Sequence, residues 1–201
     1  MRNLINRIPE DLSITSNEET AELNLSHPNA IQREILNNRN KDKNITLAKL
    51  TAHSLVMSND VVVIGELKGE EAMVFFDAVS TGHRGYATVH SDSSKNTLDR
   101  LVTLVKRDIS AQSYTDKYLR KLLAMSVDVV IFMKNFKVHE IAEVIYDEEL
   151  QDAKYNILFE FKVDRYENGK SIGHFEKVND PIDKVKEKIE LSDLEIERVL
   201  A

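Results

Sequence analysis

The stretch that decides the fold runs from Val61 to Ser91 and reads VVVIGELKGEEAMVFFDAVSTGHRGYATVHS. It opens with four consecutive β-branched apolar residues, Val61 to Ile64, a pattern typical of a strand buried on both faces. The run ends at Gly65 and a lone carboxylate, Glu66, and two histidines, His83 and His90, follow later in the stretch. The stretch therefore predicts a buried strand that carries a carboxylate out of the core, then a helix and a second strand at Tyr86–His90 that the histidines flank.

Helical and strand-like segments alternate on both sides of this stretch. Upstream lies a weak strand, Ser13–Asn17, which is polar for a buried strand, and Asn44 is positioned to cap a helix over residues 45–57. Downstream, the pattern predicts a helix through Leu98 and Val105, a further buried strand at 127–133, and edge or antiparallel strands at 139–146 and 155–163. This order predicts an α/β fold with a mostly parallel sheet.

The end of the chain changes character. Residues 167–173, ENGKSIG, have the composition of a turn, and Asp183–Leu200 has the spacing of an amphipathic helix with a solvated, charge-balanced outer face. We expect one domain over residues 1–164 and a tail of turn plus helix over 165–201. The helix is expected to pack through four apolar side chains: Val185, Ile189, Ile196 and Val199.

The composition is that of a globular chain, with 42% hydrophobic and 30% charged residues among 201. No apolar run reaches about 18 residues, the length that a membrane span needs, and no signal-peptide pattern is present. The absence of cysteine excludes disulfides and thiolate metal sites and favours a reducing cytoplasm. A net charge of −7 argues against a general nucleic-acid surface, so no nucleic-acid partner is expected.

Glu66 has two interpretations from the pattern alone. Open parallel sheets place functional groups just past the carboxyl ends of their strands. A carboxylate there can orient a water for attack on a terminal phosphate or hold the water shell of Mg²⁺. Alternatively, Glu66 is a solvated residue before a helix whose Glu70 and Glu71 interact favourably with the helix dipole.

The histidines and the acidic run EETAE leave similar alternatives. If their strand neighbours the Val61 strand, His83 and His90 can orient Glu66 or sense phosphate; otherwise they are a turn residue and a strand-end residue without a ligand. Glu18, Glu19 and Glu22 can hold a hydrated magnesium, or they form an acidic surface turn. A metal site on the two histidines is the weakest option, because no further ligand has a suitable spacing.

Other catalytic motifs are missing from the sequence. It contains no G-x-S-x-G elbow and no cysteine nucleophile. Its six glycines never form G-x-x-x-x-G-K-[ST] or G-x-G-x-x-G. The 201 residues therefore lack a recognisable loop for cradling phosphate.

Taken together, these segments resemble the ATPases that power type II secretion, type IV secretion and type IV or Tad-type pili, which are hexameric motors with RecA-like cores. The acidic motif of that family resembles EETAEL (18–23), its Walker B strand resembles VVVIGELKGEEA (61–72), and its histidine box resembles STGHRGYATVHSDS (80–93). The likeness extends from Met1 to about Val163 and weakly through the tail. It implies a partial RecA-like P-loop NTPase fold with a mostly parallel sheet and a helical C-terminal tail.

The resemblance also implies roles for particular residues. Glu66 would prepare the attacking water, and His83 and His90 would link the nucleotide state to subunit movement. The acidic box near magnesium would comprise Glu18, Glu19 and Glu22. ATP and magnesium would be the cofactors. The partners would be identical subunits of a hexamer and membrane platform proteins, at a cytoplasmic location that includes the inner face of the cell membrane.

Two departures from the family stand beside these matches. The phosphate loop of the family lies just before the helix whose end resembles MRNLINRIPEDL (1–12), so this chain begins a few turns too late to include it. Arginines of the family are replaced by other residues at four positions: Ser13, Val56, Ser58 and Lys68. Lysine provides only a point charge where arginine provides a planar fork of donors. Tight binding of ATP by this chain alone is therefore not expected.

Two functions of different classes follow. In the first, the chain is the C-terminal portion of a secretion or pilus ATPase and does not hydrolyse ATP alone. In the second, it is a non-hydrolysing subunit with a structural or regulatory part in such a machine. A RecA-like DNA motor is disfavoured, because the chain is acidic and lacks a basic stripe.

Overall fold

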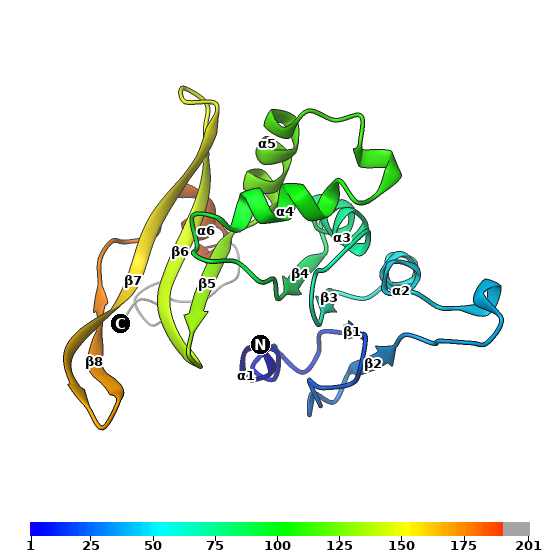
Figure 1. Ribbon diagram of the computed structural model, residues 1–201, viewed down its shortest axis with the longest axis horizontal. Helices are drawn as coiled ribbons and strands as arrows, with labels where there is room; N and C mark the ends of the chain where they lie inside the picture. Colours follow the sequence, from blue (N-terminus) through cyan, green and yellow to red (C-terminus); the bar gives the residue numbers. More distant parts are fainter. Residues whose placement is uncertain (191–201) are drawn as a thin grey trace. The chain divides into compact units, whose positions relative to one another are not determined.

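The computed structural model describes residues 1–190 and divides the chain into two compact units. The first unit comprises residues 1–90 and 100–115, and the second comprises residues 91–99 together with the described residues from 116 onward. The domain boundary expected after residue 164 is therefore not where the chain divides, because that position lies inside a strand of the second unit. The α/β fold class with a parallel sheet is confirmed (Figure 1).

The first unit is built on four parallel strands in the order β2-β1-β3-β4 (Figure 1). The strands are β1 (Ile14–Glu18), β2 (Ala30–Glu34), β3 (Val61–Ile64) and β4 (Arg84–Ala87). β3 pairs with β1 on one side and β4 on the other, and all of its residues are 0% exposed. The predicted buried strand is confirmed, whereas β4 begins two residues before the predicted strand Tyr86–His90 and overlaps it only at residues 86–87.

β1 is buried along its whole length, like β3, although four of its five residues are polar. Thr15, Ser16 and Asn17 are each at most 1% exposed. The Asn17 amide accepts a hydrogen bond from Arg33 Nε at 3.0 Å and donates one to Ser54 Oγ at 2.9 Å. Arg33 also donates to Ser54 Oγ at 2.5 Å, and burial lowers the pKa of its guanidinium. Asn17 can therefore occupy the sheet interior, because its polar atoms have partners on a neighbouring strand and helix.

The helical elements of the first unit are α1 (Arg2–Ile5), η1 (Lys41–Lys43), α2 (Leu47–Ser54), α3 (Glu71–Ser80), most of α4 (Thr97–Val105) and η2 (Ile109–Ala111). The N-cap of α2 is Thr46, whose side chain accepts from the Lys49 amide, and not the predicted Asn44. α3 packs against β4 so closely that a Cβ at Gly85 would lie 2.5 Å from Val79 Cγ2 and 2.7 Å from Phe75 Cζ. The absence of a side chain at Gly85 permits this approach.

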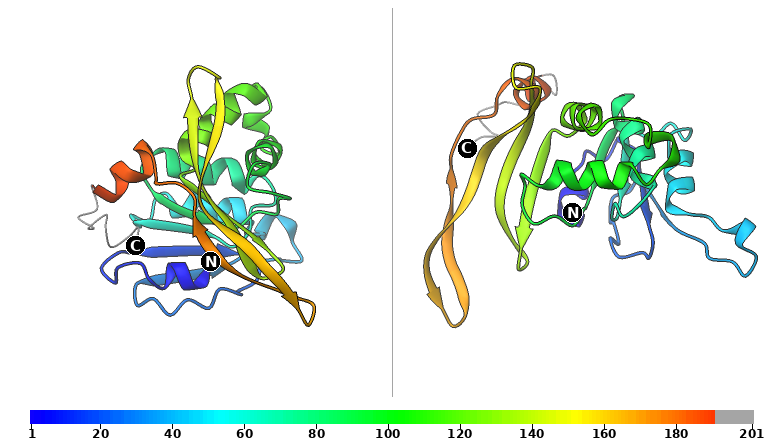
Figure 2. Two further views of the ribbon diagram at one scale, coloured as in Figure 1. Left: turned by 90° about the vertical axis from the view of Figure 1, so that its left-hand side faces the viewer. Right: turned by 45° about the horizontal axis from the view of Figure 1, so that its top comes forward.

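The second unit is built on an antiparallel sheet in the order β5-β6-β7-β8 (Figures 1 and 2). Its strands are β5 (Val129–Lys134), β6 (Lys137–Asp147), β7 (Asp152–Glu167) and β8 (Lys170–Lys177). The antiparallel strands predicted at 139–146 and 155–163 are confirmed as parts of β6 and β7. In Figure 2, β7 and β8 form a long twisted ribbon.

One prediction for this unit is wrong, and another is confirmed only over a shorter range. The strand predicted as buried at 127–133 corresponds to β5, which within the described residues pairs with β6 alone. Its apolar side chains are substantially exposed: Val129 by 37%, Ile131 by 39% and Met133 by 54%. The turn predicted at 167–173 is a tight hairpin at Asn168 and Gly169, with φ of 49° and 74°, from which the chain returns as β8.

The second unit also contains α5 (Asp116–Ser126), which contacts β6 and β7, and α6 (Asp183–Glu190). Glu143 on β6 is 0% exposed, and its carboxylate accepts from the amides of Ile182 at 2.8 Å and Val185 at 3.2 Å. This carboxylate therefore binds the first turn of α6, where helix amides lack partners of their own.

The predicted tail helix is confirmed over residues 183–190. Val185 and Ile189 are partly buried, as predicted, whereas Ile196 and Val199 lie outside the described residues. Among the helices of the described part of the chain, none has the length and apolarity needed to cross a membrane.

Candidate functional site

The candidate site lies at the carboxyl edge of the parallel sheet, where β1 and β3 end side by side. Asn17 pairs with Ile64, so the next residues, Glu18 and Gly65, are neighbours, and Glu66 follows directly. A Cβ at Gly65 would lie 3.1 Å from Glu18 Cγ. Gly65 follows β3 directly, and its lack of a side chain leaves room for the Glu18 side chain beside it.

Glu18 shapes the loop that follows β1. It is 3% exposed, and its Oε2 accepts from the amides of Glu22 and Leu23, both at 2.9 Å. Its Oε1 is buried and has no hydrogen-bond partner among the described residues. Glu22 contributes only its backbone amide to this loop, while its side chain is exposed. The three carboxylates of EETAE therefore do not converge on one point.

Glu66 lies between two positively charged or protonatable side chains. His90 Nε2 lies 3.2 Å from Glu66 Oε1, and Lys68 Nζ lies 3.2 Å from Glu66 Oε2. Lys68 Nζ also lies 2.8 Å from Glu19 Oε2. Hydrogen bonds to Glu19 and Glu66 raise the pKa of Lys68. The structure thus brings together Glu19, Glu66, Lys68 and His90, which we call the carboxyl-edge cluster.

The loop after Glu66 is held by residues that the sequence did not assign to the site. The amides of Lys68 and Gly69 donate to Glu71 Oε1 at 2.5 and 2.7 Å. The Arg107 guanidinium donates to the Lys68 carbonyl. The sequence places Glu71 only at the start of a helix, and nothing in it indicates that its carboxylate turns back to bind the preceding loop.

A second connection ties this loop to the segment after β4, which carries His90. The Leu67 amide donates to the Thr88 carbonyl at 2.8 Å, and Thr88 Oγ1 donates to the Gly65 carbonyl at 2.5 Å. These bonds extend the pairing of β3 and β4 beyond the strands themselves. They hold His90 beside Glu66 although the His90 side chain is 89% exposed.

The expectation that His83 shares this edge is wrong. His83 precedes β4, and Arg84, the first residue of β4, pairs with Val61, the first residue of β3. His83 therefore lies at the amino edge of the sheet, where its Nδ1 is 3.2 Å from the Ala78 carbonyl at the end of α3. In this parallel sheet, a residue before a strand and a residue after its neighbour lie at opposite edges.

The side chains at the carboxyl edge do not fit a magnesium site as they are arranged. Glu18 binds backbone amides, and a lysine ammonium lies between Glu19 and Glu66. Within residues 1–190, no group of three His, Cys, Asp or Glu side chains is placed to hold a metal ion. In this arrangement these side chains do not form a metal centre.

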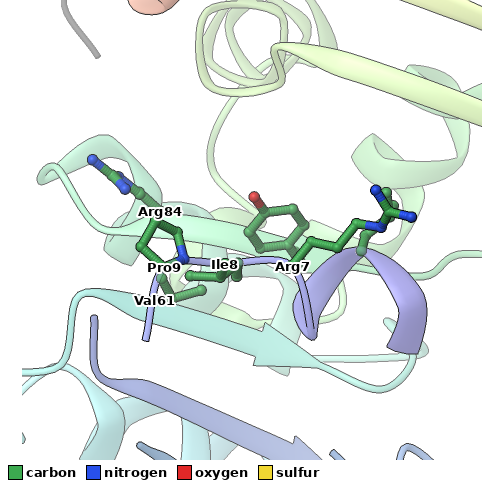
Figure 3. Close-up of a pocket in the computed structure, with 7 residues that line it drawn as sticks. Arg7, Ile8, Pro9, Val61 and Arg84 are labelled. Atoms are coloured by element: carbon green, nitrogen blue, oxygen red, sulfur yellow. The ribbon is translucent and has the colours of Figure 1, made fainter. Parts of the chain in front are cut away.

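A pocket of about 200 Å³ lies away from the carboxyl-edge cluster, over the amino-terminal ends of β3 and β4. It is lined by α1 and the turn that follows it, together with Val61, Arg84 and Tyr86. Arg7 and Arg84 extend from opposite sides of this pocket (Figure 3). Because it opens at the edge opposite Glu66, this pocket is separate from the candidate site.

Comparison with known proteins decides the family. The profile of the family described as "Type II/IV secretion system protein" matches residues 1–151. The chain belongs to this family. Members that resemble it include the type IV secretion system protein VirB11 of Brucella suis, 31% identical over 162 residues, which cover 76% of this chain and 45% of the relative. Protein VirB11 of Agrobacterium fabrum is 29% identical over 145 residues, covering 71% of this chain and 42% of the relative.

Solved structures of secretion and pilus ATPases share the fold. The crystal structure of the VirB11 ATPase from the Brucella suis type IV secretion system, in complex with sulphate, has a TM-score of 0.64 at 26% identity and covers 71% of this chain and 43% of that chain. The pilus retraction motor PilT with bound ADP has a TM-score of 0.53 at 16% identity, covers 98% and 46% of the two chains, and supports the fold alone. This member of the secretion ATPase family spans less than half the length of the two VirB11 proteins and of the VirB11 crystal structure.

Proposed function

We propose that this chain is the C-terminal portion of an ATPase that powers a type II or type IV secretion system or the assembly of a type IV or Tad-type pilus. The observation that carries the proposal is the position of Glu66 just past the carboxyl end of β3, with Glu18 and His90 at the same edge. Ligands of open parallel sheets bind outside the carboxyl ends of the strands. Within a secretion ATPase family, that position suits the residue that acts on the attacking water.

In this proposal Glu66 orients and activates the water, and His90 holds the carboxylate from the other side. A group that accepts a proton must lie within hydrogen-bond reach of the water. Glu66 is 28% exposed on its side chain, so it is accessible while its two oxygens are held by His90 and Lys68. The contact with Glu66 also suits His90 to respond when a nucleotide alters the position of that carboxylate.

ATP is the proposed nucleotide, but this chain alone is expected neither to bind it tightly nor to hydrolyse it. The 201 residues contain no phosphate loop. Charge-assisted hydrogen bonds of the kind that such a loop provides contribute about 1.5–3 kcal/mol each. Since about 1.4 kcal/mol corresponds to a tenfold change in affinity, the loss of several contacts weakens binding by orders of magnitude.

A non-hydrolysing subunit is the second candidate, and one observation favours it. Lys68 bridges Glu19 and Glu66, so the proposed catalytic carboxylate is engaged by a cation of its own chain. In either case we propose a hexameric assembly of identical subunits. It would act in the cytoplasm at the inner face of the membrane, with platform proteins of a secretion or pilus system as partners.

The two candidates are separated by reconstitution with a polypeptide that carries the phosphate loop of a related ATPase. Calorimetric ATP titration and phosphate release are measured for the chain alone and with this partner. Turnover that appears only with the partner supports the first candidate, the C-terminal portion of an ATPase. In that case Glu66→Gln should abolish turnover while leaving nucleotide binding nearly intact. Glu70→Gln, at an exposed neighbouring glutamate, is the matched control and should retain turnover.

The other outcomes are equally informative. An assembly that forms with the partner but never releases phosphate supports the non-hydrolysing subunit. Micromolar ATP binding by the 201-residue chain alone would overturn the proposal that the chain is catalytically incomplete.

A further inference from the structure

Lys68 stands between two carboxylates that come from the ends of different strands. Its Nζ lies 2.8 Å from Glu19 Oε2, just after β1, and 3.2 Å from Glu66 Oε2, just after β3. An ammonium group has three N–H donors, so a lysine can serve both carboxylates at once. The negative charge that the two strand ends bring together is thus compensated from within the chain.

The backbone of Lys68 is fixed on both sides, which distinguishes this bridge from an ordinary surface ion pair. Its amide donates to Glu71 Oε1, and its carbonyl accepts from Arg107. The preceding residue, Leu67, is 3% exposed and anchors the loop in the core. Exposed ion pairs usually contribute little, partly because two flexible side chains must be ordered. Here the backbone of Lys68 is already held by hydrogen bonds, so only its side chain has to be ordered.

We infer that Lys68 is the resident counter-cation of the Glu19–Glu66 pair and excludes divalent cations from it. Carboxylates that lie close together and reach solvent are the ligands that hydrated Mg²⁺ and Mn²⁺ bind. With the ammonium between these two carboxylates, a metal ion has to displace Lys68 before it can bind them. This inference goes beyond the proposed function and is tested without nucleotide or partner.

The test is a Mn²⁺ titration of the full chain, with the free aquo ion followed by electron paramagnetic resonance. The wild-type chain should show no saturable site that depends on Glu19. Lys68→Met keeps most of the side-chain length but removes the charge, and it should bind Mn²⁺ about tenfold more tightly or better. Adding Glu19→Gln to Lys68→Met should abolish this gain.

Two controls separate charge from structure. Lys68→Arg restores a cation and should return Mn²⁺ binding to the wild-type level, which a merely structural effect of residue 68 would not predict. Lys43→Met removes an exposed lysine of η1 and should change nothing. Circular dichroism and the thermal midpoint verify that each variant folds.

Either of two results would overturn the inference. One is a saturable Mn²⁺ site in the wild-type chain that Glu19→Gln removes. This measurement stands on its own even if Lys68→Met fails to fold. The other is a folded Lys68→Met variant whose Mn²⁺ affinity equals that of the wild type.

Discussion

Replacing Gly85 with alanine tests how closely α3 packs against β4. The added Cβ would lie 2.5 Å from Val79 Cγ2 and 2.7 Å from Phe75 Cζ, whereas carbon atoms in contact lie about 3.5–4.0 Å apart. Phe75 is 4% exposed and packs edge-on against Phe76 with ring centroids 5.3 Å apart, so its ring has little room to move. Overpacking of this kind costs about 1–3 kcal/mol, and removing a glycine from a strand offsets about 0.5–1 kcal/mol of that. We expect a free energy of unfolding lower by about 1–2 kcal/mol.

The assay is urea unfolding followed by circular dichroism. With an m-value of about 1–3 kcal/mol per molar urea, the expected loss lowers the midpoint by about 0.3–2 M. Val79→Ala removes one of the two clashing groups, so the double variant Gly85→Ala/Val79→Ala should lose less stability than the sum of the two single variants. A midpoint that stays unchanged or rises in Gly85→Ala would refute the packing argument.

Two further predictions concern the second unit. Glu143→Leu removes the acceptor of the Ile182 and Val185 amides, so hydrogen exchange of amides at the start of α6, measured by mass spectrometry, should accelerate by about tenfold or more. Glu143→Gln keeps an acceptor oxygen and should accelerate this exchange less. Equal exchange in the wild type and both variants would contradict this role of Glu143. Arg120→Met should raise the pKa of Asp152 toward 3.8, because the hydrogen bond from Arg120 is the main cause that lowers it. A lowered pKa contributes stability above pH 3.8 that is lost as the pH falls through the folded-state pKa, so the variant should lose less stability over that acidic range. Carboxyl-carbon NMR titration checks the shift, and an unchanged pKa of Asp152 would exclude Arg120 as its cause.

The core of the site could be predicted from the sequence because it follows from strand order alone. Val61–Ile64 is apolar throughout, which specifies burial on both faces, and a parallel strand then delivers Glu66 to the carboxyl edge. His90 follows the neighbouring strand and lies at that edge for the same reason. The same reasoning places His83 at the opposite edge, because His83 precedes both the predicted strand Tyr86–His90 and the observed β4. The expectation for His83 is wrong because it places a residue before a strand and a residue at its end at the same edge.

Long-range polar contacts account for most of what the sequence did not predict. The polar atoms of the buried Asn17 on β1 are satisfied by Arg33 and Ser54, which lie 16 and 37 residues from it. Glu71 looks like an ordinary first-turn acid, yet it holds the loop that presents Lys68. The periodicity of apolar residues predicts strands and helices, but it does not indicate which distant donors and acceptors form hydrogen bonds.

The exposure of β5 has a different origin. Its first four residues are β-branched or aromatic, which predicts a strand but not how many neighbours that strand has. In the described residues β5 pairs on one side only, and its first five side chains alternate between exposed and half-buried, which is the pattern of a strand with one face toward solvent. Burial of a strand is a property of the sheet around it and cannot be read from the strand alone.

The division of the chain into units limits how it can be taken apart. The polypeptide leaves the first unit after His90, returns to it at Arg100 and leaves again after Thr115. No single cut therefore yields two fragments that each contain one whole unit, because any cut leaves part of one unit on the other fragment. Domains that occupy one continuous segment can be exchanged between genes by a single recombination event, with a boundary in an exposed linker. These two units alternate along the chain, so a single recombination event cannot transfer one whole unit without part of the other.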